Sequence, residues 1–385
     1  MQAIKRWMND PAARAAADSF GDGTAIIETA IAIQQIPAPT FDEAQRGADV
    51  AERMRALALA DVRIDAVGNV YGRRAGRAGG PGLLIAAHLD TVFPAGTNLA
   101  VRRDGARIYG PGLGDNSMGV AALLHLAQAL EQADLANAGD IWFVANVGEE
   151  GLGDLLGMRA AVEQLGELVG AAIALEGCDP GRIIHAGLGV RRYQISARAG
   201  GGHSWSDFGS PSAIHALVRL AAQLTQLDVP KEPRSSFNIG VIQGGSSVNT
   251  IAERASLLLD LRSTAPDGLG TLIEQVEQII ANARTAEAGV TFAIETVGDR
   301  PAGNIAREHA LAQLAGAAYA AEGLGEVYEI ASTDANIPLS RGIPAVCIGV
   351  CDGGNAHRLD EYIEPARLPS GMRALLWLAL ATTSE

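Results

Sequence analysis

The residues with the clearest chemical potential are a histidine and a carboxylate that follow a short apolar segment. Five small or apolar residues, 83–87, predict a buried strand, and His88 and Asp90 come directly at its end. Side chains alternate between the two faces of a strand, so His88 and Asp90 project to the same side. This arrangement suits a metal-binding imidazole that a neighbouring carboxylate orients. Taken alone, the segment fits equally well a histidine and an aspartate that only face solvent.

Five more acidic or imidazole groups lie at or just after the ends of other predicted elements: Asp115, Glu149, Glu150, Glu176 and His357. Two histidines with carboxylates suit zinc, manganese or cobalt, because these cations accept both nitrogen and oxygen ligands. Seven groups are too many for one structural ion, and a bridging aspartate with one histidine and one carboxylate for each ion fits a co-catalytic pair. Of the adjacent Glu149 and Glu150, one can bind metal while the other holds the proton of an attacking water.

The elements that must position these groups follow the pattern of an open α/β sheet. Residues 140–147 and 170–175 predict two more buried strands, and each is followed by a carboxylate. A glycine-rich stretch, 110–119, carries Asp115 and opens a predicted helix. In open α/β sheets the site lies beyond the carboxyl ends of the strands. The glycines do not follow a strand with the G-x-G-x-x-G spacing, which disfavours a nucleotide-binding loop.

Residues 190–300 have a different order of predicted strands and helices from the rest of the chain. Their pattern predicts strand, helix, strand, strand, helix and strand in that order, which matches a ferredoxin-like unit inserted in a larger domain. We therefore expect a catalytic metal-binding domain of residues 1–189 and 301–385 and an inserted domain of residues 190–300. The stretch between Thr91 and Tyr109 is expected to be an irregular loop.

Composition excludes several classes of partner. The formal charge is −14 and aromatic residues make up 4% of the chain, which argues against a surface for nucleic acid or for anionic membranes. No apolar run approaches the roughly 18 residues needed to cross a bilayer. The three cysteines are too few and too oddly placed for a disulfide framework, and the first residues lack the apolar core of a signal peptide. We expect a cytoplasmic protein with neither a nucleic-acid nor a membrane partner.

Taken together, the motifs resemble those of the di-zinc metallopeptidase and amidohydrolase superfamily of aminoacylase, carboxypeptidase G and peptidase T, including enzymes like succinyl-diaminopimelate desuccinylase. The resemblance implies a phosphorylase/hydrolase-like α/β catalytic domain with a mixed sheet, plus an inserted ferredoxin-like (βαββαβ) lid and dimerisation domain. The motifs that carry it are His88-Leu89-Asp90-Thr91-Val92, Gly114-Asp115-Asn116, Gly148-Glu149-Glu150, Leu175-Glu176-Gly177 and Ala356-His357.

The resemblance implies two divalent metal ions per chain, with Zn²⁺ favoured and Co²⁺ or Mn²⁺ as alternatives. The resemblance also implies that Asp115 bridges the two ions. His88 and Glu176 would complete one metal site, and Glu150 and His357 would complete the other. Similar enzymes hold the peptide bond that follows the bridging aspartate in the cis form, so this bond is expected to be cis here.

The remaining roles also follow from the resemblance. Asp90 would support the metal-binding histidine, and Glu149 would be the general base. His203 would reach the active site of a partner chain in a homodimer formed through the inserted domain, and would stabilise the oxyanion there. Asn249 and Arg262 fall where similar enzymes hold the substrate carboxylate, and the planar fork of an arginine can bind a carboxylate bidentately.

One residue departs from the pattern of many relatives, which carry a lysine where this chain has Ser117. The departure leaves the substrate open. We favour a di- or tripeptidase or a carboxypeptidase acting on a small carboxylate-bearing substrate, with an N-acyl-amino-acid deacylase as the alternative. A metal-dependent binding protein that has lost catalysis is a weaker hypothesis, because it predicts a damaged ligand set or base. A nucleotide-dependent enzyme ranks last.

Overall fold

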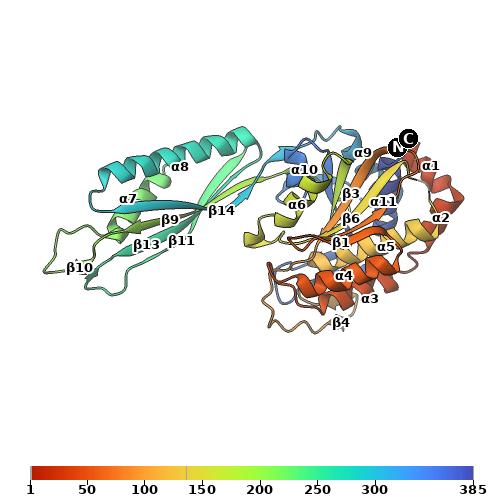
Figure 1. Ribbon diagram of the computed structural model, residues 1–385, viewed down its shortest axis with the longest axis horizontal. Helices are drawn as coiled ribbons and strands as arrows, with labels where there is room; N and C mark the ends of the chain where they lie inside the picture. The colour runs from red at the N-terminus through yellow and green to blue at the C-terminus, as the bar shows by residue number, and fades with distance from the viewer. Residues whose placement is uncertain (1, 136, 385) are drawn as a thin grey trace. The chain divides into compact units, whose positions relative to one another are not determined.

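The computed structural model describes residues 2–135 and 137–384 and divides the chain into two compact units (Figure 1). Unit 1 is formed by Met1–Gly187 together with Asn304–Glu385, and unit 2 is the continuous segment Leu188–Gly303. Unit 1 is thus assembled from both ends of the chain. All seven groups singled out for metal chemistry belong to it.

Four parallel strands form the centre of the mixed sheet in unit 1. In the order of the sheet they are β6 (Gly139–Asn146), β3 (Gly80–His88), β7 (Val169–Cys178) and β17 (Ala345–Gly354). The register aligns His88 with Asn146, so neighbouring strands bring their carboxyl ends to one edge. Parallel strands are usually covered on both faces, which explains why these segments are almost continuously apolar.

Shorter strands extend this sheet on both sides and complete its mixed character. On one side stand β2 (Val70–Arg74) and β1 (Ala60–Ile64), both antiparallel to their neighbours. Beyond β17 the sheet continues through β18 (Tyr362–Glu364), β5 (Arg107–Tyr109) and β4 (Arg102–Asp104), and it also branches to β8 (Arg182–Gly187), β16 (Val327–Ala331) and β15 (Gly303–Asn304).

From the sequence, the stretch between Thr91 and Tyr109 was expected to be an irregular loop. This prediction is wrong in part, because the stretch contains the short strands β4 and β5. Each of these strands has only three residues, too short for a period-2 pattern to be recognised. β5 pairs with β18, which lies more than 250 residues further along the chain, and Tyr362 of β18 is in register with Tyr109 of β5. Only the tertiary fold brings these segments together.

Helices cover both faces of the sheet, and β3 shows how its residues serve both layers. Leu83, Ile85 and Ala87 are buried in a large apolar cluster on one face. Leu84 and Ala86 are buried in a second cluster on the other face. The helices of the first cluster include α1 (Gln2–Asn9), α2 (Pro11–Asp18), α3 (Thr24–Gln34), α4 (Ala44–Ala56), α5 (Gly119–Gln132), α9 (Ala310–Ala321) and α11 (Leu368–Thr382), and those of the second are α6 (Leu156–Leu165) and α10 (Asn336–Ser340).

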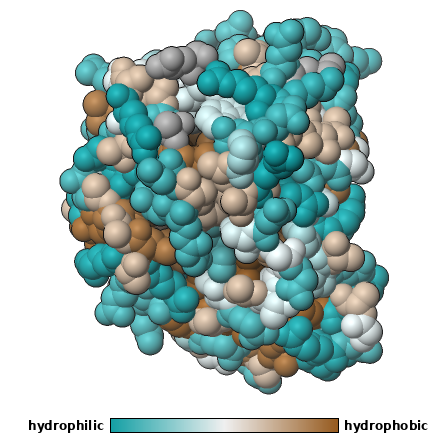
Figure 2. Space-filling model, turned by 90° about the vertical axis from the view of Figure 1, so that its right-hand side faces the viewer, coloured by the Kyte–Doolittle hydropathy of each residue, from teal (hydrophilic) through white to brown (hydrophobic). Residues whose placement is uncertain are grey.

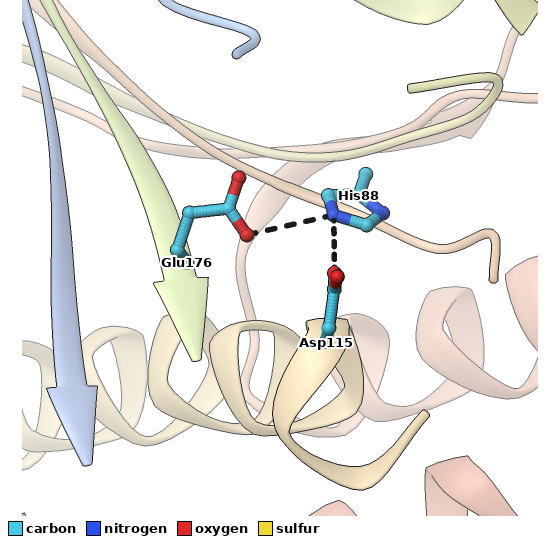
Figure 3. Close-up of side chains that lie close together, drawn as sticks. All are labelled: His88, Asp115 and Glu176. Carbon is cyan, nitrogen blue, oxygen red and sulfur yellow. Dashed lines mark ion pairs between the residues drawn. The ribbon is translucent and has the colours of Figure 1, made fainter. Parts of the chain in front are cut away.

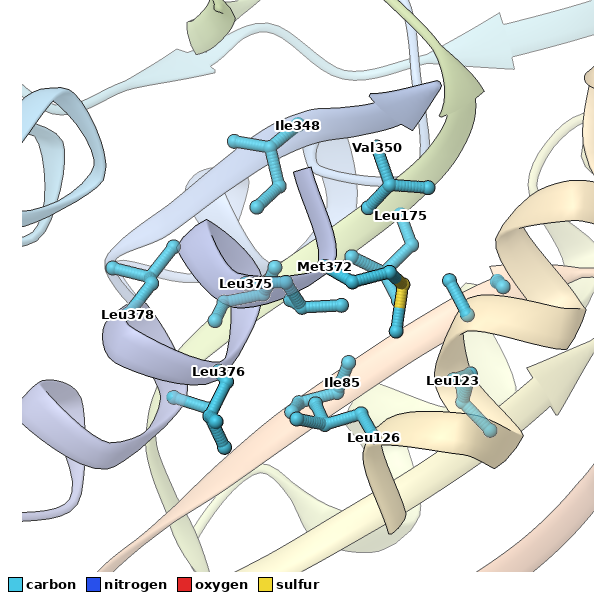
Figure 4. Packing of buried hydrophobic residues seen from close by; sticks show 14 of the residues in the cluster. Ile85, Leu123, Leu126, Leu175, Ile348, Val350, Met372, Leu375, Leu376 and Leu378 are labelled. Carbon is cyan, nitrogen blue, oxygen red and sulfur yellow. The ribbon is translucent and has the colours of Figure 1, made fainter. Parts of the chain in front are cut away.

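Figure 4 shows how the first cluster joins distant parts of the sequence below the carboxyl ends of the strands. Ile85 of β3 and Leu126 of α5 lie close to Leu376 of α11, and Met372 of α11 lies near Leu175 of β7 (Figure 4). All five residues are 2% exposed or less. Close packing of this kind fixes the strand ends from which the candidate ligands project.

Unit 2 has the predicted order of strands and helices. Its four-stranded antiparallel sheet has the order β11-β13-β9-β14, and α7 and α8 pack against one face, where a third apolar cluster is buried (Figure 1). With its strands numbered along the chain, this is the 4-1-3-2 order of a ferredoxin-like fold. The elements are β9 (Gly189–Arg198), α7 (Ala213–Leu224), β11 (Ser235–Gly244), β13 (Arg254–Ser263), α8 (Pro266–Ala286) and β14 (Thr291–Arg300).

Local sequence explains where the helices of unit 2 begin. The Ser212 hydroxyl accepts the backbone N–H of His215 at the start of α7, and Pro266 occupies the first turn of α8. A separate two-stranded pair, β10 (Gly202–His203) with β12 (Thr250–Ile251), stands beside the main sheet. It joins the segment that carries His203 to the segment that carries Asn249.

Most charged side chains of the described residues lie outside the buried core. The face presented in Figure 2 is hydrophilic over much of its area, with hydrophobic residues gathered in smaller areas. Among the described residues, no helix combines the length and the apolar character that crossing a membrane requires.

Candidate metal centre

Three elements of unit 1 converge on the first group of candidate ligands. His88 is the last residue of β3, Glu176 lies on the neighbouring strand β7, and Asp115 lies in the wide helical turn Leu113–Met118 that precedes α5. Figure 3 shows the Asp115 and Glu176 side chains directed at the His88 ring. The Nε2 atom of His88 lies 3.1 Å from Asp115 Oδ1 and 3.6 Å from Glu176 Oε2.

The second group shares Asp115 with the first. Glu150 follows β6, and His357 lies in the loop between β17 and β18. The Nε2 atom of His357 lies 2.9 Å from Glu150 Oε1 and 3.1 Å from Asp115 Oδ2. Glu150 is buried, whereas the His357 side chain is 53% exposed, so the second group lies nearer to solvent.

Asp115 stands between the two histidines, with one carboxylate oxygen toward each. Oδ1 faces His88 and Oδ2 faces His357, both at 3.1 Å from the respective Nε2 atom. Oδ1 is fully buried, and the group that faces it is the His88 ring, with which it forms an ion pair. A buried carboxylate oxygen needs such a positive partner, which is either a protonated imidazole or a cation. The donor set of carboxylates and imidazoles fits a pair of divalent cations of the zinc type.

Asp90 links the end of β3 to the segment that follows β6. Its Oδ1 lies 3.4 Å from His88 Nδ1, on the side of the ring away from Asp115. Its two oxygens also accept the backbone N–H groups of Glu149 and Glu150, both at 3.0 Å, and the Thr40 hydroxyl at 2.9 Å. Asp90 is completely buried, so these donors satisfy a carboxylate that solvent cannot reach.

The carboxylates of the cluster favour positive charge on the two histidines that they surround. Burial alone would lower the pKa of His88, but Asp115, Asp90 and Glu176 raise it well above its ordinary value. Hydrogen bonds that the His357 ring donates to the carboxylates of Asp115 and Glu150 raise the pKa of His357 to about 10. Burial would raise the pKa of Asp115, yet the two histidines lower it below its ordinary range. Without metal, the excess of carboxylates is thus balanced by protons on the imidazoles.

Glu149 is buried beside the second glutamate. His88, Glu149 and Glu150 each offer one ligand atom, and these atoms lie within 4.8 Å of one another. The same criterion groups His88 with Asp115 and Glu176, and Asp115 with Glu150 and His357. The structure therefore brings together all six residues that the sequence suggested as ligands or base in unit 1.

The peptide bond between Asp115 and Asn116 is cis, which confirms the expectation drawn from the resemblance. The Asn116 side chain donates to the carbonyl of Leu175 at 2.7 Å and so links this turn to β7. Ser117, at the position that departs from many relatives, is completely buried. A side chain at Gly119 would meet Asn116 Oδ1, so a glycine is needed where α5 begins.

The three candidate residues of unit 2 fall into two places. His203 and Asn249 lie together, because β10 pairs with β12 and the Ser204 N–H donates to the Asn249 carbonyl at 3.0 Å. Arg262 lies near the far end of β13, where it pairs in register with Val190. Its Nε donates to Asp260 at 2.7 Å. Within unit 2, Arg262 therefore does not lie beside His203 and Asn249.

Sequence reasoning gave no role to Glu361, which the structure places directly behind Asp115. Glu361 is 1% exposed, and its carboxylate accepts the backbone N–H groups of Gly112, Gly114 and Asp115 at 2.7, 2.7 and 2.9 Å. Burial raises the pKa of Glu361 to about 7 despite these donors. The only signal in the sequence is an acid four residues after His357.

A second buried carboxylate was also not foreseen. Asp334 is 2% exposed and accepts a hydrogen bond of 2.8 Å from the side chain of Asn146, the residue aligned with His88. Burial raises the pKa of Asp334 to about 6. Asp334 precedes α10, a helix of only five residues. No apolar pattern in this segment indicates the end of a strand, so the sequence did not suggest a role for Asp334.

Comparison with known proteins identifies the family of this chain. A model described as peptidase family M20/M25/M40 matches residues 84–381, which include every candidate ligand. The chain belongs to this family. An M20 protein is a metal-dependent hydrolase of peptide or amide bonds, in agreement with the carboxylate and imidazole cluster.

Individual relatives are consistent with this assignment. Succinyl-diaminopimelate desuccinylase of Corynebacterium glutamicum is 25% identical over 353 residues, which cover 89% of this chain and 92% of that enzyme. A tripeptidase from Staphylococcus aureus has a similar structure, with a TM-score of 0.78, 22% identity and coverage of 94% and 98% of the two chains. The Bacillus subtilis YXEP protein, a dinuclear metal-binding peptidase of the M20 family, has a TM-score of 0.70, 17% identity and coverage of 94% and 98%. These likenesses support the fold of both units.

Proposed function

We propose that this M20 protein uses two divalent metal ions to hydrolyse an amide bond in a small substrate that bears a free carboxylate. The position of Asp115 carries the proposal, because its two oxygens face two histidines and each histidine has a second carboxylate beside it. His88 and Glu176 would hold one ion with Asp115, and Glu150 and His357 would hold the other.

Within this site Glu149 is the proposed general base. A pair of divalent ions supplies polarisation of the amide carbonyl and activation of water. Glu150 lies 2.9 Å from His357 and is assigned to metal binding, so its neighbour Glu149 is assigned to proton transfer. Glu149 takes the proton of the attacking water and passes it to the leaving amine. The hydrogen bond from its backbone N–H to Asp90 fixes the backbone of Glu149 beside the cluster.

His203 is the proposed stabiliser of the oxyanion, and its surroundings fix the tautomer that this role needs. The Nδ1 atom of His203 accepts the backbone N–H groups of Trp205 and Ser206 at 3.2 and 3.4 Å. A neutral imidazole that accepts at Nδ1 carries its proton on Nε2. The ring is exposed, so this N–H is available to an oxygen that develops negative charge.

The placement of residues in unit 2 supports action between two chains. Arg254 starts β13 near the His203 pair, and Arg262 stands eight residues further along the same strand. At about 3.3 Å per residue these positions are about 26 Å apart. A small substrate held by both His203 and Arg262 would need them from different copies. We therefore propose a homodimer through unit 2, with His203 and Asn249 from one chain and Arg262 from the other.

The finer assignments are proposals of the same kind. Zn²⁺ is the favoured metal, with Co²⁺ or Mn²⁺ as alternatives, and the three free cysteines favour the reducing cytoplasm. A di- or tripeptidase or carboxypeptidase is favoured, and an N-acyl-amino-acid deacylase is the alternative. Both classes use the same groups at the reacting amide and differ in what lies on its acyl side.

A hydrolysis screen tests the proposal. The purified protein is loaded with Zn²⁺, Co²⁺ or Mn²⁺ and offered dipeptides, tripeptides and N-acyl amino acids, each beside its C-terminally amidated form. We expect metal-dependent release of an amino acid and a marked loss of rate with the amidated forms, because Arg262 and Asn249 lose the carboxylate. Equal rates on free acids and amides would reject the proposed substrate class. No hydrolysis of any substrate by a protein holding two ions would favour a metal-dependent binding protein.

A further inference from the structure

Glu361 connects the segments that carry two of the three ligands of the second metal group, Asp115 and His357. It closes the loop after His357 and comes directly before β18. Its own N–H donates to the Arg358 carbonyl at 3.0 Å, and its carbonyl accepts the Gly110 N–H at 2.9 Å. The backbone of this one residue therefore joins the His357 loop to the start of the Asp115 turn.

The side chain of Glu361 makes the second part of the connection. Its Oε1 accepts the N–H groups of both Gly114 and Asp115, and its Oε2 accepts the N–H of Gly112. Hydrogen bonds from backbone N–H groups to an ionised carboxylate are roughly twice as strong as neutral ones. All are buried or partly buried, so water does not compete freely for these donors.

The glycine before Asp115 permits this close approach. A side chain at Gly114 would come within 3.1 Å of Glu361 Oε1 and 2.7 Å of Cys178 Sγ. The backbone of the turn is thus pressed between the Glu361 carboxylate and β7. A carboxylate here can set the direction in which the next residue, Asp115, projects.

We propose that Glu361 is a positioning residue for the two-metal reaction, holding the backbone of Asp115 so that its two oxygens face the two ions. The proposal rests on the function proposed above, since Asp115 is assigned there as the bridging ligand. Glu361 would contact neither metal nor substrate. It would act by fixing the separation and orientation of the two ions, a kind of support whose loss typically costs 10–100-fold in metal affinity or activity.

The test compares Glu361→Gln with Glu364→Gln. The first change keeps the size of the side chain but replaces one accepting oxygen with an NH₂ group that faces backbone donors. The control applies the same change three residues away, to a surface glutamate whose partner is Arg107 at 2.7 Å. For each protein the binding of Co²⁺ is followed by its visible absorption, and kcat and KM are measured at saturating metal per metal-loaded chain.

We expect Glu361→Gln to bind Co²⁺ about 10–100-fold more weakly, with an altered absorption spectrum, and to lose kcat by a similar factor while KM stays within about threefold. A merely structural role would lower the folded fraction and leave kcat per loaded chain unchanged. Wild-type metal binding and kcat in a folded Glu361→Gln protein would overturn the proposal. So would a variant that stays unfolded in excess metal, because Glu361 would then serve the fold.

The proposed function is judged separately in the same experiment. The wild-type protein and Glu364→Gln must each bind two ions and hydrolyse substrate. If both bind fewer than two ions, the function proposed for the cluster fails, whatever Glu361→Gln does.

Discussion

Asp90 and Glu149 are joined by a hydrogen bond of 3.0 Å in which the Asp90 carboxylate accepts the Glu149 backbone N–H. The bond connects the residue that faces the back of the His88 ring with the proposed general base. Because the same carboxylate also accepts the N–H of Glu150, one buried group sets the positions of a ligand, a base and a second ligand. A change at Asp90 should therefore affect both metal binding and proton transfer.

Replacing Asp90 with asparagine should weaken metal binding about 10–100-fold, because the imidazole loses its charged partner and one backbone N–H loses its acceptor. Metal titration followed by equilibrium dialysis measures the effect. Asp49→Asn is a matched control, since Asp49 only pairs with Arg53 on the surface of α4. Wild-type affinity in Asp90→Asn would show that His88 needs no such support.

The metal content should be two divalent ions per chain, because the ligand atoms form two groups that share Asp115. Chelation should abolish hydrolysis, and adding Zn²⁺, Co²⁺ or Mn²⁺ should restore it. Elemental analysis of the purified protein and of the chelated form measures both quantities. Full activity at a saturating content of one ion per chain would exclude the bridged pair.

The two adjacent glutamates should respond differently to the same change. Glu149→Gln is expected to keep both ions and the affinity for substrate while losing several orders of magnitude in kcat, since proton transfer is removed. Glu150→Gln is expected to bind metal more weakly, because it loses the carboxylate beside His357. If Glu149→Gln loses metal but keeps its rate, the two roles are reversed.

His203→Ala should bind metal normally and turn over about 10²–10³-fold more slowly, the usual effect of losing one oxyanion donor. Mixing His203→Ala with Glu149→Ala chains tests whether the imidazole acts on the partner. Random exchange of equal amounts makes half of the dimers mixed, and one site of each mixed dimer has both groups, so about a quarter of sites should recover. Subunit exchange without recovery would place His203 in its own chain or outside the reaction.

A stability effect is expected at Arg46, which is 2% exposed and donates to the carbonyls of Leu89 and Ile36 at 2.7 and 2.6 Å. Arg46→Met would leave both carbonyls without a donor beside the His88 strand. At roughly 1–3 kcal/mol per buried unpaired group, we expect unfolding to become easier by about 3 kcal/mol. Urea denaturation measures this, with Arg53→Met as control, because Arg53 is a half-buried arginine of the same helix that pairs with Asp49. An unchanged midpoint would mean that water replaces the guanidinium.

The sequence was most informative where chemistry and local pattern coincide. The strands that end at His88 and near Glu149 are apolar on both faces, and this signal lies within a few neighbouring residues. The order of elements in unit 2 was likewise predicted, since alternating burial and helical periodicity are local. The conformation of the bond after Asp115 came only from the resemblance to a family.

What the sequence could not predict depends on contacts between distant segments. β5 pairs with the distant β18 on one side and with β4 on the other, and Glu361 matters because its loop returns to the Asp115 turn. Arg46 lies in an ordinary polar helix, and nothing in its neighbourhood indicates that it is buried against carbonyl groups. Such contacts are decided by the tertiary fold, in which a residue's partner is hundreds of positions away or belongs to the backbone.

The division of unit 1 between the two ends of the chain has a consequence for its synthesis. All strands and helices of unit 2 lie between residues 188 and 303, so this unit has its full sequence while the chain is still being translated. The metal centre is made in two stages, because His88, Asp115 and Glu176 precede unit 2, whereas His357 and the α11 residues that pack below the strand ends follow it. The ligand group that includes His357 therefore lacks one member until the last part of the chain has been made, and the two groups that share Asp115 can be completed only near the end of translation.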